Sequence, residues 1–418
     1  MNITLLSSIV DVDGFLADMA RDLIQERKHP EDSDLRIYSY TKKAQYGGLW
    51  TPAAKLARGL ILRVPGGDFS KAVVVSRGLP KFFTLEQIDS DWGRVKLVDD
   101  DENVVVSEAP VIPWDAPAVV AEKMNGALGL GYVDSTGKFR ISTKGSFESL
   151  ESTVANRVLD GKYSAVLDEL AVDTGYTMLF EIITPERPHP VDYGDLEDLI
   201  FLGSVSNATG AWFPSEENSK MAELGFPVAP RKSVATLREA VALPYAANTE
   251  GFVVTVVDGG PEAIYKIKPK EYLDLRRLFY AVQEGELVKL ALTESFAESA
   301  FSAKGPDDID LSSLVGSLAI SAQTERLLAA AKGKLYFEVA LPARQLVFEA
   351  VGRIRAVLPG LKKSSSSDRE LRAALANFVK GSVPKELQGL HFAAMKYVLG
   401  GGLEVAMKLG ISIVVAEL

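Results

Sequence analysis

The sequence contains no cysteine and only three histidines, and both shortages restrict what kind of protein it can be. Without cysteine the chain has no disulfide, no thiolate metal site and no cysteine nucleophile. The three histidines, His29, His189 and His391, lie far apart in the chain, which argues against a histidine-rich metal site.

Long hydrophobic runs are also missing. No uncharged apolar run approaches the roughly 20 residues that a membrane-spanning helix needs. The first residues, Met1 to Thr4, lack the basic and then apolar pattern of a signal peptide. We therefore expect a cytoplasmic protein without a membrane partner, and we expect it to be a monomer.

The charge is uneven along the chain. The net charge is −10, which argues against a nucleic-acid partner when the chain is taken as one body. Residues 321–418, however, contain 14 Lys and Arg against 8 Asp and Glu, while the first 320 residues contain 32 against 48. A basic C-terminal part fits a polyanionic partner, and an ordinary mixed, solvated surface is the alternative interpretation.

The length of 418 residues predicts two or three domains, and the residue pattern changes once. Short strand-like runs dominate up to about residue 270, and Leu- and Ala-rich helical patterns follow. We predict an α+β domain of antiparallel sheets with helices over residues 1–284 and an all-α domain over residues 285–418. Predicted strands cover 35–40, 58–63, 72–76, 119–122, 128–133, 139–143, 176–183, 199–205, 250–257 and 263–268. Predicted helices cover 13–28, 148–160, 215–224, 234–241, 272–283, 287–302, 324–331, 346–357, 370–380, 387–399 and 403–409, with a polar loop at 360–367.

The most informative stretch is the apolar run Val119–Ala121, which leads to Glu122, Lys123, Met124, Asn125 and Gly126. A lysine at the mouth of a buried strand is disfavoured in its charged form, which is one way a lysine becomes a nucleophile. Gly126 predicts a tight turn or a close backbone approach to a ligand. The alternative for Lys123 is a surface lysine whose stem covers apolar area.

A second lysine lies near the first if residues 118–146 form one hairpin. The return strand at 139–143 ends at Lys144, so the two strands would deliver Lys123 and Lys144 to neighbouring ends. Two adjacent cations are costly to bury without an anion between them, which predicts a polyphosphate ligand.

Two further motifs place cations at strand ends. Arg58 precedes Gly59 at the start of a strand, and Lys81 precedes Phe82 and Phe83. Each cation is suited to hold phosphate, since a guanidinium matches phosphate geometry and a lysine supplies a point charge. An edge arginine and a surface lysine are the structural alternatives.

Carboxylates and paired lysines complete the set. Glu181 interrupts the apolar strand 176–183, so it is either a buried charge with a function or a solvent-facing residue on an alternating strand. Glu250 precedes Gly251 at the start of another strand. Lys266 and Lys268 are two residues apart and predict one shared strand face, with a solvated face as the alternative.

Taken in order, these motifs resemble the covalent nucleotidyltransferase superfamily of ATP-dependent ligases and mRNA capping enzymes. They look most like the phage tRNA-repair RNA ligases, the family typified by the first RNA ligase of the T-even phages. The resemblance covers about residues 35–275. It implies an ATP-grasp-like ligase domain that uses ATP and Mg²⁺ or Mn²⁺, and RNA with 5′-phosphate and 3′-hydroxyl ends, tRNA among them, as partner. A phage origin would put the protein in the host cytoplasm.

The resemblance also implies a role for each matched residue. Lys123 would attack the α-phosphorus of ATP, giving lysyl-AMP, and AMP would pass to an RNA 5′-phosphate before the 3′-hydroxyl displaces it. The other implied roles are β- and γ-phosphate contacts by Arg58, Lys81 and Lys144, a ribose contact by Glu181, a metal contact by Glu250, and α-phosphate contacts by Lys266 and Lys268. Glu122 and Gly126 belong to the implied nucleotide pocket, and Phe83, Asn125 and Tyr272 belong to the same motifs.

The sequence departs from the superfamily at two positions and leaves other functions open. Asn125 stands where the superfamily usually has Asp, and Ala127 replaces a frequent Ser, which puts fine adenosine contacts in doubt. A DNA ligase, a GTP-using capping-type transferase and a non-catalytic RNA-binding relative are the alternatives. The helical C-terminal pattern argues against the first two, which would have a strand-rich OB-fold there.

Overall fold

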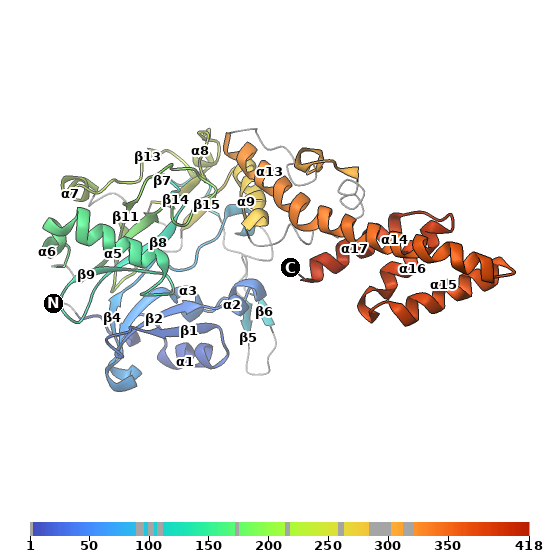
Figure 1. Ribbon diagram of the computed structural model, residues 1–418. Helices are drawn as coiled ribbons and strands as arrows, with labels where there is room; N and C mark the ends of the chain where they lie inside the picture. Colours follow the sequence, from blue (N-terminus) through green and yellow to red (C-terminus); the bar gives the residue numbers. More distant parts are fainter. Residues whose placement is uncertain are drawn as a thin grey trace. The chain divides into compact units, whose positions relative to one another are not determined.

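A computed structural model describes most of the chain and divides it into two compact units, Met1–Tyr272 and Leu273–Leu418 (Figure 1). The described residues are 3–88, 96–98, 104–106, 112–171, 175–213, 218–257, 263–283, 302–311 and 322–417. The predicted domain boundary at residues 284 and 285 lies outside the described residues, as does most of the predicted helix 287–302.

The described residues of the first unit form three antiparallel sheets in addition to a two-stranded ribbon. The most N-terminal sheet has the order β1-β2-β3-β4, and the short helix α1 (Val12–Ala20) packs onto it. Its strands are β1 (Ile24–Lys28), β2 (Leu35–Tyr40), β3 (Arg58–Arg63) and β4 (Val73–Ser76), with the ribbon of β5 (Lys96–Val98) and β6 (Val104–Val106) following in the chain. Short helices α2 (Lys42–Gly47), α3 (Pro52–Leu56) and α4 (Leu85–Ile88) connect these elements.

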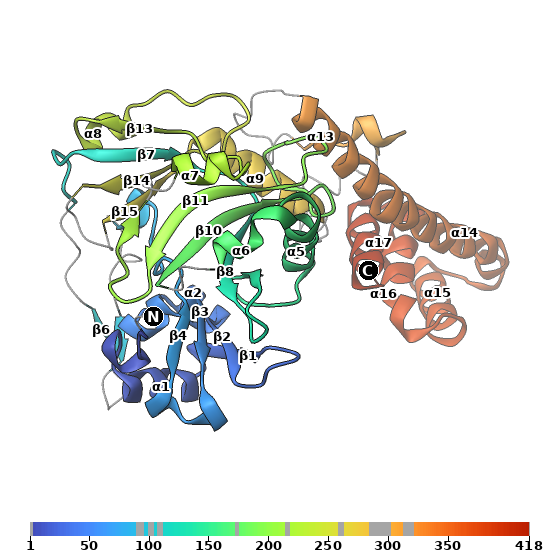
Figure 2. The same ribbon diagram turned by 90° about the vertical axis from the view of Figure 1, so that its left-hand side faces the viewer.

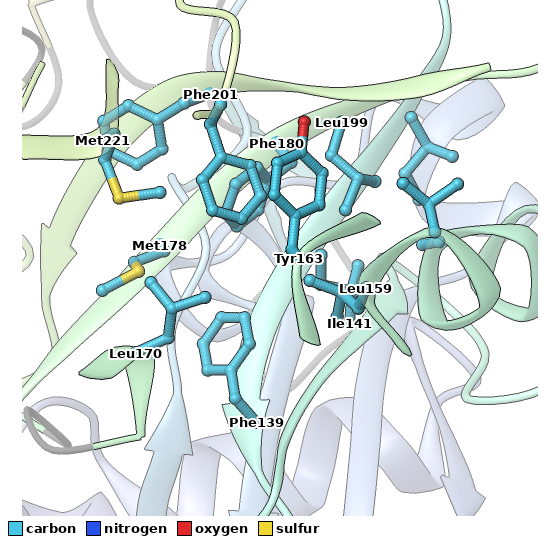
Figure 3. Packing of buried hydrophobic residues seen from close by; sticks show 14 of the residues in the cluster. Phe139, Ile141, Leu159, Tyr163, Leu170, Met178, Phe180, Leu199, Phe201 and Met221 are labelled. Atoms are coloured by element: carbon cyan, nitrogen blue, oxygen red, sulfur yellow. The ribbon is translucent and has the colours of Figure 1, made fainter. Parts of the chain in front are cut away.

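The second sheet has the order β12-β11-β10-β8-β9 and is covered by helix α5 (Leu150–Lys162). Its strands are β8 (Ala127–Val133), β9 (Phe139–Thr143), β10 (Tyr176–Ile183), β11 (Asp198–Ser206) and β12 (Trp212–Phe213). Helix α5 begins where the Ser149 hydroxyl accepts a hydrogen bond from Ser152 N. Its apolar face and helix α6 (Leu167–Leu170) pack onto the sheet around Phe180 and Phe201, in the cluster drawn in Figure 3.

The third sheet, β13-β7-β14-β15, lies next to the second in both ribbon views (Figures 1 and 2). Its strands are β7 (Ala118–Glu122), β13 (Arg231–Val234), β14 (Phe252–Val256) and β15 (Ile264–Ile267). Helices α7 (Asn218–Glu223) and α8 (Leu237–Val241) flank β13 in the chain. A small apolar cluster joins the two sheets and contains Leu130 from β8, Leu179 from β10 and Ile264 from β15 together with Phe82.

The second unit is helical, and its described residues form their own apolar clusters. Helix α9 (Lys270–Gln283) begins at the end of the first unit. Further described helices of this unit are α13 (Ala322–Lys334), a π-helical turn (Leu335–Ala340), α14 (Leu341–Ser364), α15 (Asp368–Ser382), α16 (Gln388–Val398) and α17 (Glu404–Glu417). In the part of the chain that the structure describes, no helix combines the length and apolarity needed to cross a membrane.

The predicted fold class is confirmed, since antiparallel sheets with helices precede a helical C-terminal part. Three local predictions are wrong. Residues 24–28 form strand β1 rather than the end of a helix. Helix α14 extends to Ser364, so residues 360–364 are helical rather than a loop. Residues 118–146 are not one hairpin, because the chain leaves the third sheet after β7 and enters the second at β8.

Candidate active site at the junction of two sheets

Lys123 lies where the chain crosses from the third sheet to the second. It follows β7, and its backbone N–H donates to Gly251 O at 2.9 Å, which extends the pairing of β7 with β14 by one residue. Only residues 123–126 separate the end of β7 from the start of β8. Lys123 is therefore held at a strand end, and Lys144, which follows β9, comes from the other sheet.

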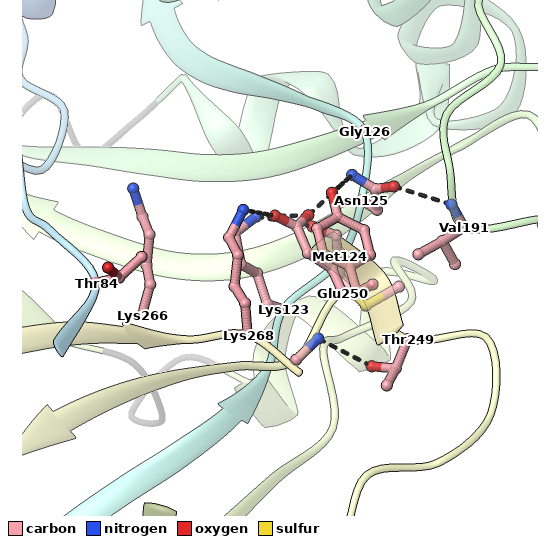
Figure 4. Close-up of polar contacts among 12 residues, drawn as sticks. Thr84, Lys123, Met124, Asn125, Gly126, Val191, Thr249, Glu250, Lys266 and Lys268 are labelled. Atoms are coloured by element: carbon pink, nitrogen blue, oxygen red, sulfur yellow. Dashed lines mark hydrogen bonds and ion pairs between the residues drawn. The ribbon is translucent and has the colours of Figure 1, made fainter. Parts of the chain in front are cut away.

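Glu250 joins the two lysines nearest the crossing (Figure 4). Its Oε2 lies 2.8 Å from Lys123 Nζ, and its Oε1 lies 2.7 Å from Lys268 Nζ. The carboxylate is only 4% exposed. Burial raises the pKa of Glu250, but the two lysines outweigh it, so the pKa lies below its ordinary value and the group is ionised.

Asn125 connects the crossing to three other segments. Its Nδ2 donates to Glu250 Oε2 at 2.9 Å and to the Tyr272 hydroxyl at 3.2 Å. Its Oδ1 accepts from Val191 N at 3.0 Å, and its backbone N–H donates to the Tyr193 hydroxyl at 2.8 Å. The side chain is 7% exposed, so these contacts satisfy a buried amide.

Gly126 allows the backbone to approach Glu181. Its N–H donates to Glu181 Oε1 at 2.8 Å, and a Cβ at this position would lie 2.4 Å from Ile182 O. Glu181 is 7% exposed, because β10 is buried along nearly its whole length and does not alternate between core and solvent. Burial raises the pKa of Glu181 to about 7, with Lys123 and Arg58 acting against the rise.

A second group of cations surrounds aromatic rings. Lys81 Nζ lies 5.0 Å from the ring centre of Phe83, 5.2 Å from that of Trp50 and 5.8 Å from that of Tyr40. Lys144 Nζ also lies near Tyr40, at 5.2 Å from its ring centre. Ring faces attract cations without neutralising them.

Arg58 and Lys266 extend this group around Phe82. The Arg58 guanidinium lies 5.3 Å from the Phe82 ring centre and donates to Leu79 O at 3.2 Å. Lys266 Nζ lies 4.2 Å from the same ring centre and 3.3 Å from Phe82 O. Among the described residues, no carboxylate forms an ion pair with Arg58, Lys81, Lys144 or Lys266.

The pKa values of this cluster reflect burial and the absence of an ion-paired carboxylate among the described residues. Burial lowers the pKa of Lys266 well below its ordinary value, and Arg58, Lys81, Lys123 and Lys268 lower it further. Burial also lowers the pKa of Lys81 and of Arg58. An anion bound here would relieve the repulsion among these cations.

The remaining predicted residues lie around these two groups. Phe83 is buried beneath Lys81, and its carbonyl accepts from Lys266 N. Tyr272 is buried against Asn125 and under Lys268, whose Nζ lies 5.1 Å from its ring centre. Glu122 closes β7 opposite Phe252 of β14. Lys266 and Lys268, predicted on one face, contact different groups: Phe82 and Glu250.

Three aromatic residues near the site were not predicted. Tyr40 ends β2 between Lys81 and Lys144; burial raises its pKa, but Lys144, Arg58 and Lys81 outweigh burial and lower it. Trp50 is 1% exposed, and Lys81 Nζ lies over its ring. The Tyr193 hydroxyl accepts a hydrogen bond from the Asn125 backbone N–H. An aromatic residue ending a predicted strand was the only sequence signal for Tyr40.

The donor set is compatible with a divalent cation that shares its ligands with a substrate. No group of three or more His, Cys, Asp or Glu side chains suited to a metal occurs among the described residues. Mg²⁺ commonly binds through one or two carboxylates together with substrate phosphates and water. Glu250 and Glu181 are the buried carboxylates beside the crossing, and both oxygens of Glu250 are engaged by lysines.

Comparisons with known proteins converge on one family. A family model described as RNA ligase matches residues 56–273, which is just over half of the chain. A Thermovibrio ammonificans protein provisionally named an RNA ligase is 28% identical over 212 residues; the match covers 50% of this chain and 49% of that relative, about half its length.

Two solved structures are also similar. An archaeal ATP-dependent RNA ligase has 16% identity and a TM-score of 0.43, with 82% of this chain and 80% of that chain covered. A Naegleria gruberi RNA ligase mutant with ATP and Mn has 11% identity and a TM-score of 0.32, with 61% of this chain and 99% of that chain covered.

Proposed function

This chain belongs to the RNA ligase family, and from that membership we propose that it is an ATP-dependent RNA ligase acting through a lysyl-AMP intermediate on Lys123. Its substrates would be RNA 5′-phosphate and 3′-hydroxyl ends, such as those of a broken tRNA. The observation that carries the proposal is the contrast between two neighbouring groups of cations. Lys123 and Lys268 share the Glu250 carboxylate, whereas no carboxylate of the described residues forms an ion pair with Arg58, Lys81, Lys144 or Lys266, which lie against aromatic rings.

The second group suits the phosphates of ATP. Three phosphates carry several negative charges, and cations held without counter-charge are stabilised when such a ligand arrives. Arg58, Lys81 and Lys144 would contact the β- and γ-phosphates, while Lys266 and Lys268 would contact the α-phosphate. Glu181 would accept hydrogen bonds from the ribose hydroxyls. Its carboxylate lies close to Lys123, since its Oε1 accepts from Gly126 N.

The reaction would then proceed by three displacements at phosphorus. Lys123 Nζ gives a proton to water and attacks the α-phosphorus as a neutral amine, the bond from that phosphorus to the bridging oxygen breaks, and pyrophosphate leaves. The RNA 5′-phosphate oxygen attacks the same phosphorus, the N–P bond breaks, and RNA-adenylate forms. The 3′-hydroxyl oxygen attacks the 5′-phosphorus, AMP leaves, and a proton is released. Mg²⁺ or Mn²⁺, held by Glu250 together with phosphate oxygens, would supply charge neutralisation in these displacements.

Covalent labelling tests the proposal. Wild type, Lys123→Ala and the control Lys232→Ala are incubated with α-labelled ATP or GTP and Mg²⁺ and separated under denaturing conditions. Lys232 is an exposed lysine on β13, paired opposite Val120 of β7, so the control changes a neighbouring lysine outside the site. We expect label from ATP on wild type and on Lys232→Ala, and none on Lys123→Ala.

Each other outcome points to a different function. Label from GTP would favour a capping-type transferase, and the absence of label from either nucleotide would favour an RNA-binding protein without catalysis. Labelled wild type would next be given 5′-phosphorylated RNA or DNA of the same sequence. Faster transfer of AMP to DNA ends than to RNA ends would contradict the assignment of RNA as substrate.

A further inference from the structure

We infer that Asn125 is a positioning residue whose neutral amide holds Glu250 in contact with Lys123, and that an aspartate cannot replace it in this chain. The labelling experiment below rests on the proposed function, whereas the unfolding experiment does not. Asn125 does not touch the lysine's amine; it acts through Glu250.

The amide has a single orientation that satisfies its partners. Val191 N–H can only donate, so it requires the Oδ1 oxygen, which it meets at 3.0 Å. The ionised Glu250 carboxylate can only accept, so it requires the Nδ2 nitrogen, which it meets at 2.9 Å. A flipped amide would lose both contacts. The side chain of Asn125 therefore has a fixed donor side and a fixed acceptor side (Figure 4).

The donor side determines where the Glu250 carboxylate lies. Its Oε2 receives Asn125 Nδ2 and Lys123 Nζ, and its Oε1 receives Lys268 Nζ. Asn125 is the neutral member of this set and is two residues from Lys123, so it fixes the carboxylate relative to the nucleophile's own backbone. Without the amide donor, Glu250 would be held only by two flexible lysines.

An aspartate at position 125 would reverse this effect. It could still accept from Val191 N, but its second oxygen would lie against Glu250 Oε2 at hydrogen-bond distance. Two carboxylates in such contact repel each other in a buried site. The charges of Lys123 and Lys268 would be divided between two carboxylates, and Glu250 would be displaced from the lysine.

A thermodynamic cycle tests the contact independently of catalysis. It compares unfolding of wild type, Asn125→Asp, Glu250→Gln and the double variant. The double variant restores one carboxylate and one amide in contact, with their positions exchanged. We expect Asn125→Asp to lower the midpoint of unfolding and Glu250→Gln to restore part of it when added. Additive effects of the two changes would overturn the inference.

Single-turnover labelling from ATP tests the positioning role. The rate constant of label transfer should fall roughly ten- to a hundredfold in Asn125→Asp, the equivalent of one charged hydrogen bond, with the labelled fraction unchanged. The control Asn156→Asp removes a comparable amide on α5, whose Nδ2 donates to Ile141 O at 2.9 Å, and should keep the wild-type rate constant.

The outcomes separate the two claims. An unchanged rate constant in Asn125→Asp would overturn the positioning role. A lower labelled fraction with an unchanged rate constant would overturn it as well, since that result reports only fewer folded molecules. If wild type takes no label, the proposed function fails, while the unfolding cycle still decides whether Asn125 holds Glu250.

Discussion

Glu181 is a carboxylate inside an apolar strand, and its titration should be visible in protein stability. Its pKa is about 7 in the folded protein against an ordinary value of 4.5, so between these values the folded state binds more protons than the unfolded state. Stability from this group is present below pH 4.5 and is lost as pH rises through 7, by roughly 3 kcal/mol at most.

The variant Glu181→Gln should remove this dependence. We expect its free energy of unfolding, measured in urea, to fall less than that of wild type between pH 5 and pH 8. A glutamine oxygen can still accept from Gly126 N, so the contact itself is kept. Identical pH dependence in the two proteins would show that Glu181 does not titrate in this range.

Lys266 should lower the free energy of unfolding of the protein. Its pKa is depressed by burial and by four neighbouring cations, so the charged amine is disfavoured in the folded state. We expect Lys266→Met to raise the free energy of unfolding by roughly 1 kcal/mol and to raise the KM for ATP at least tenfold. Lys232→Met, on exposed β13, is the control and should change neither quantity. A destabilised Lys266→Met protein would contradict the unbalanced cluster.

Single side chains show where sequence reasoning ends. The apolar strand around Glu181 was predictable, but whether the carboxylate faced solvent depended on the segments that pack on each face of the β10 sheet. Lys123 and Glu250 are distant in sequence, and only the register that pairs Glu122 with Phe252 brings them together. Tyr40 gave no signal beyond its place at a strand end, because its lysine neighbours come from separate segments.

Among the strands, the crossing between β7 and β8 depends on glycine for steric reasons. A Cβ on Gly126 would lie 2.4 Å from Ile182 O, a backbone atom that cannot move without shifting β10. We expect Gly126→Ala to lower the free energy of unfolding by roughly 2 kcal/mol or more and to abolish labelling of Lys123. Gly161→Ala is the matched control.

Gly161 lies within α5, where an added Cβ meets nothing within 4 Å. Alanine favours a helix by roughly 1 kcal/mol over glycine, so this control should be slightly more stable and should label normally. A Gly126→Ala protein as stable as the control would show that the crossing tolerates a side chain.

The incorrect hairpin prediction has a physical cause at this same crossing. Residues 118–122 and 127–133 are apolar on both sides of the lysine motif, and a local pattern cannot tell one long strand from two strands in different sheets. The assignment of β7 to the third sheet comes from pairing with β13 and β14, more than 100 residues later in the chain.

The two units can be tested separately, because the C-terminal helices have their own apolar clusters and residues 321–418 contain more basic than acidic residues. Six cations are exposed along the second half of α14 and the start of α15: Arg353, Arg355, Lys362, Lys363, Arg369 and Arg372. Changing Lys362, Lys363 and Arg369 to Glu should leave labelling by ATP unchanged and weaken RNA binding. The slope of binding against salt should also decrease, since fewer counterions are released.

The control for this variant reverses three exposed cations of the N-terminal sheet region, Arg27, Lys28 and Lys42. It has the same net charge, so a difference in RNA affinity between the two variants would locate the contact. Equal losses of affinity would indicate a general charge effect and would contradict a specific role for the helical unit.

The backbone amides of Asn125 and Gly126 donate to side chains, to the Tyr193 hydroxyl and the Glu181 carboxylate, rather than to main-chain carbonyls. In a nitrogen-15 NMR spectrum the chemical shifts of these two amide protons would therefore respond to changes in the side chains that accept their hydrogen bonds. The Gly126 resonance should titrate with Glu181 near pH 7 and shift when a nucleotide enters. The protein thus contains a native spectroscopic probe beside its reactive lysine, and ligand arrival can be followed there without any turnover.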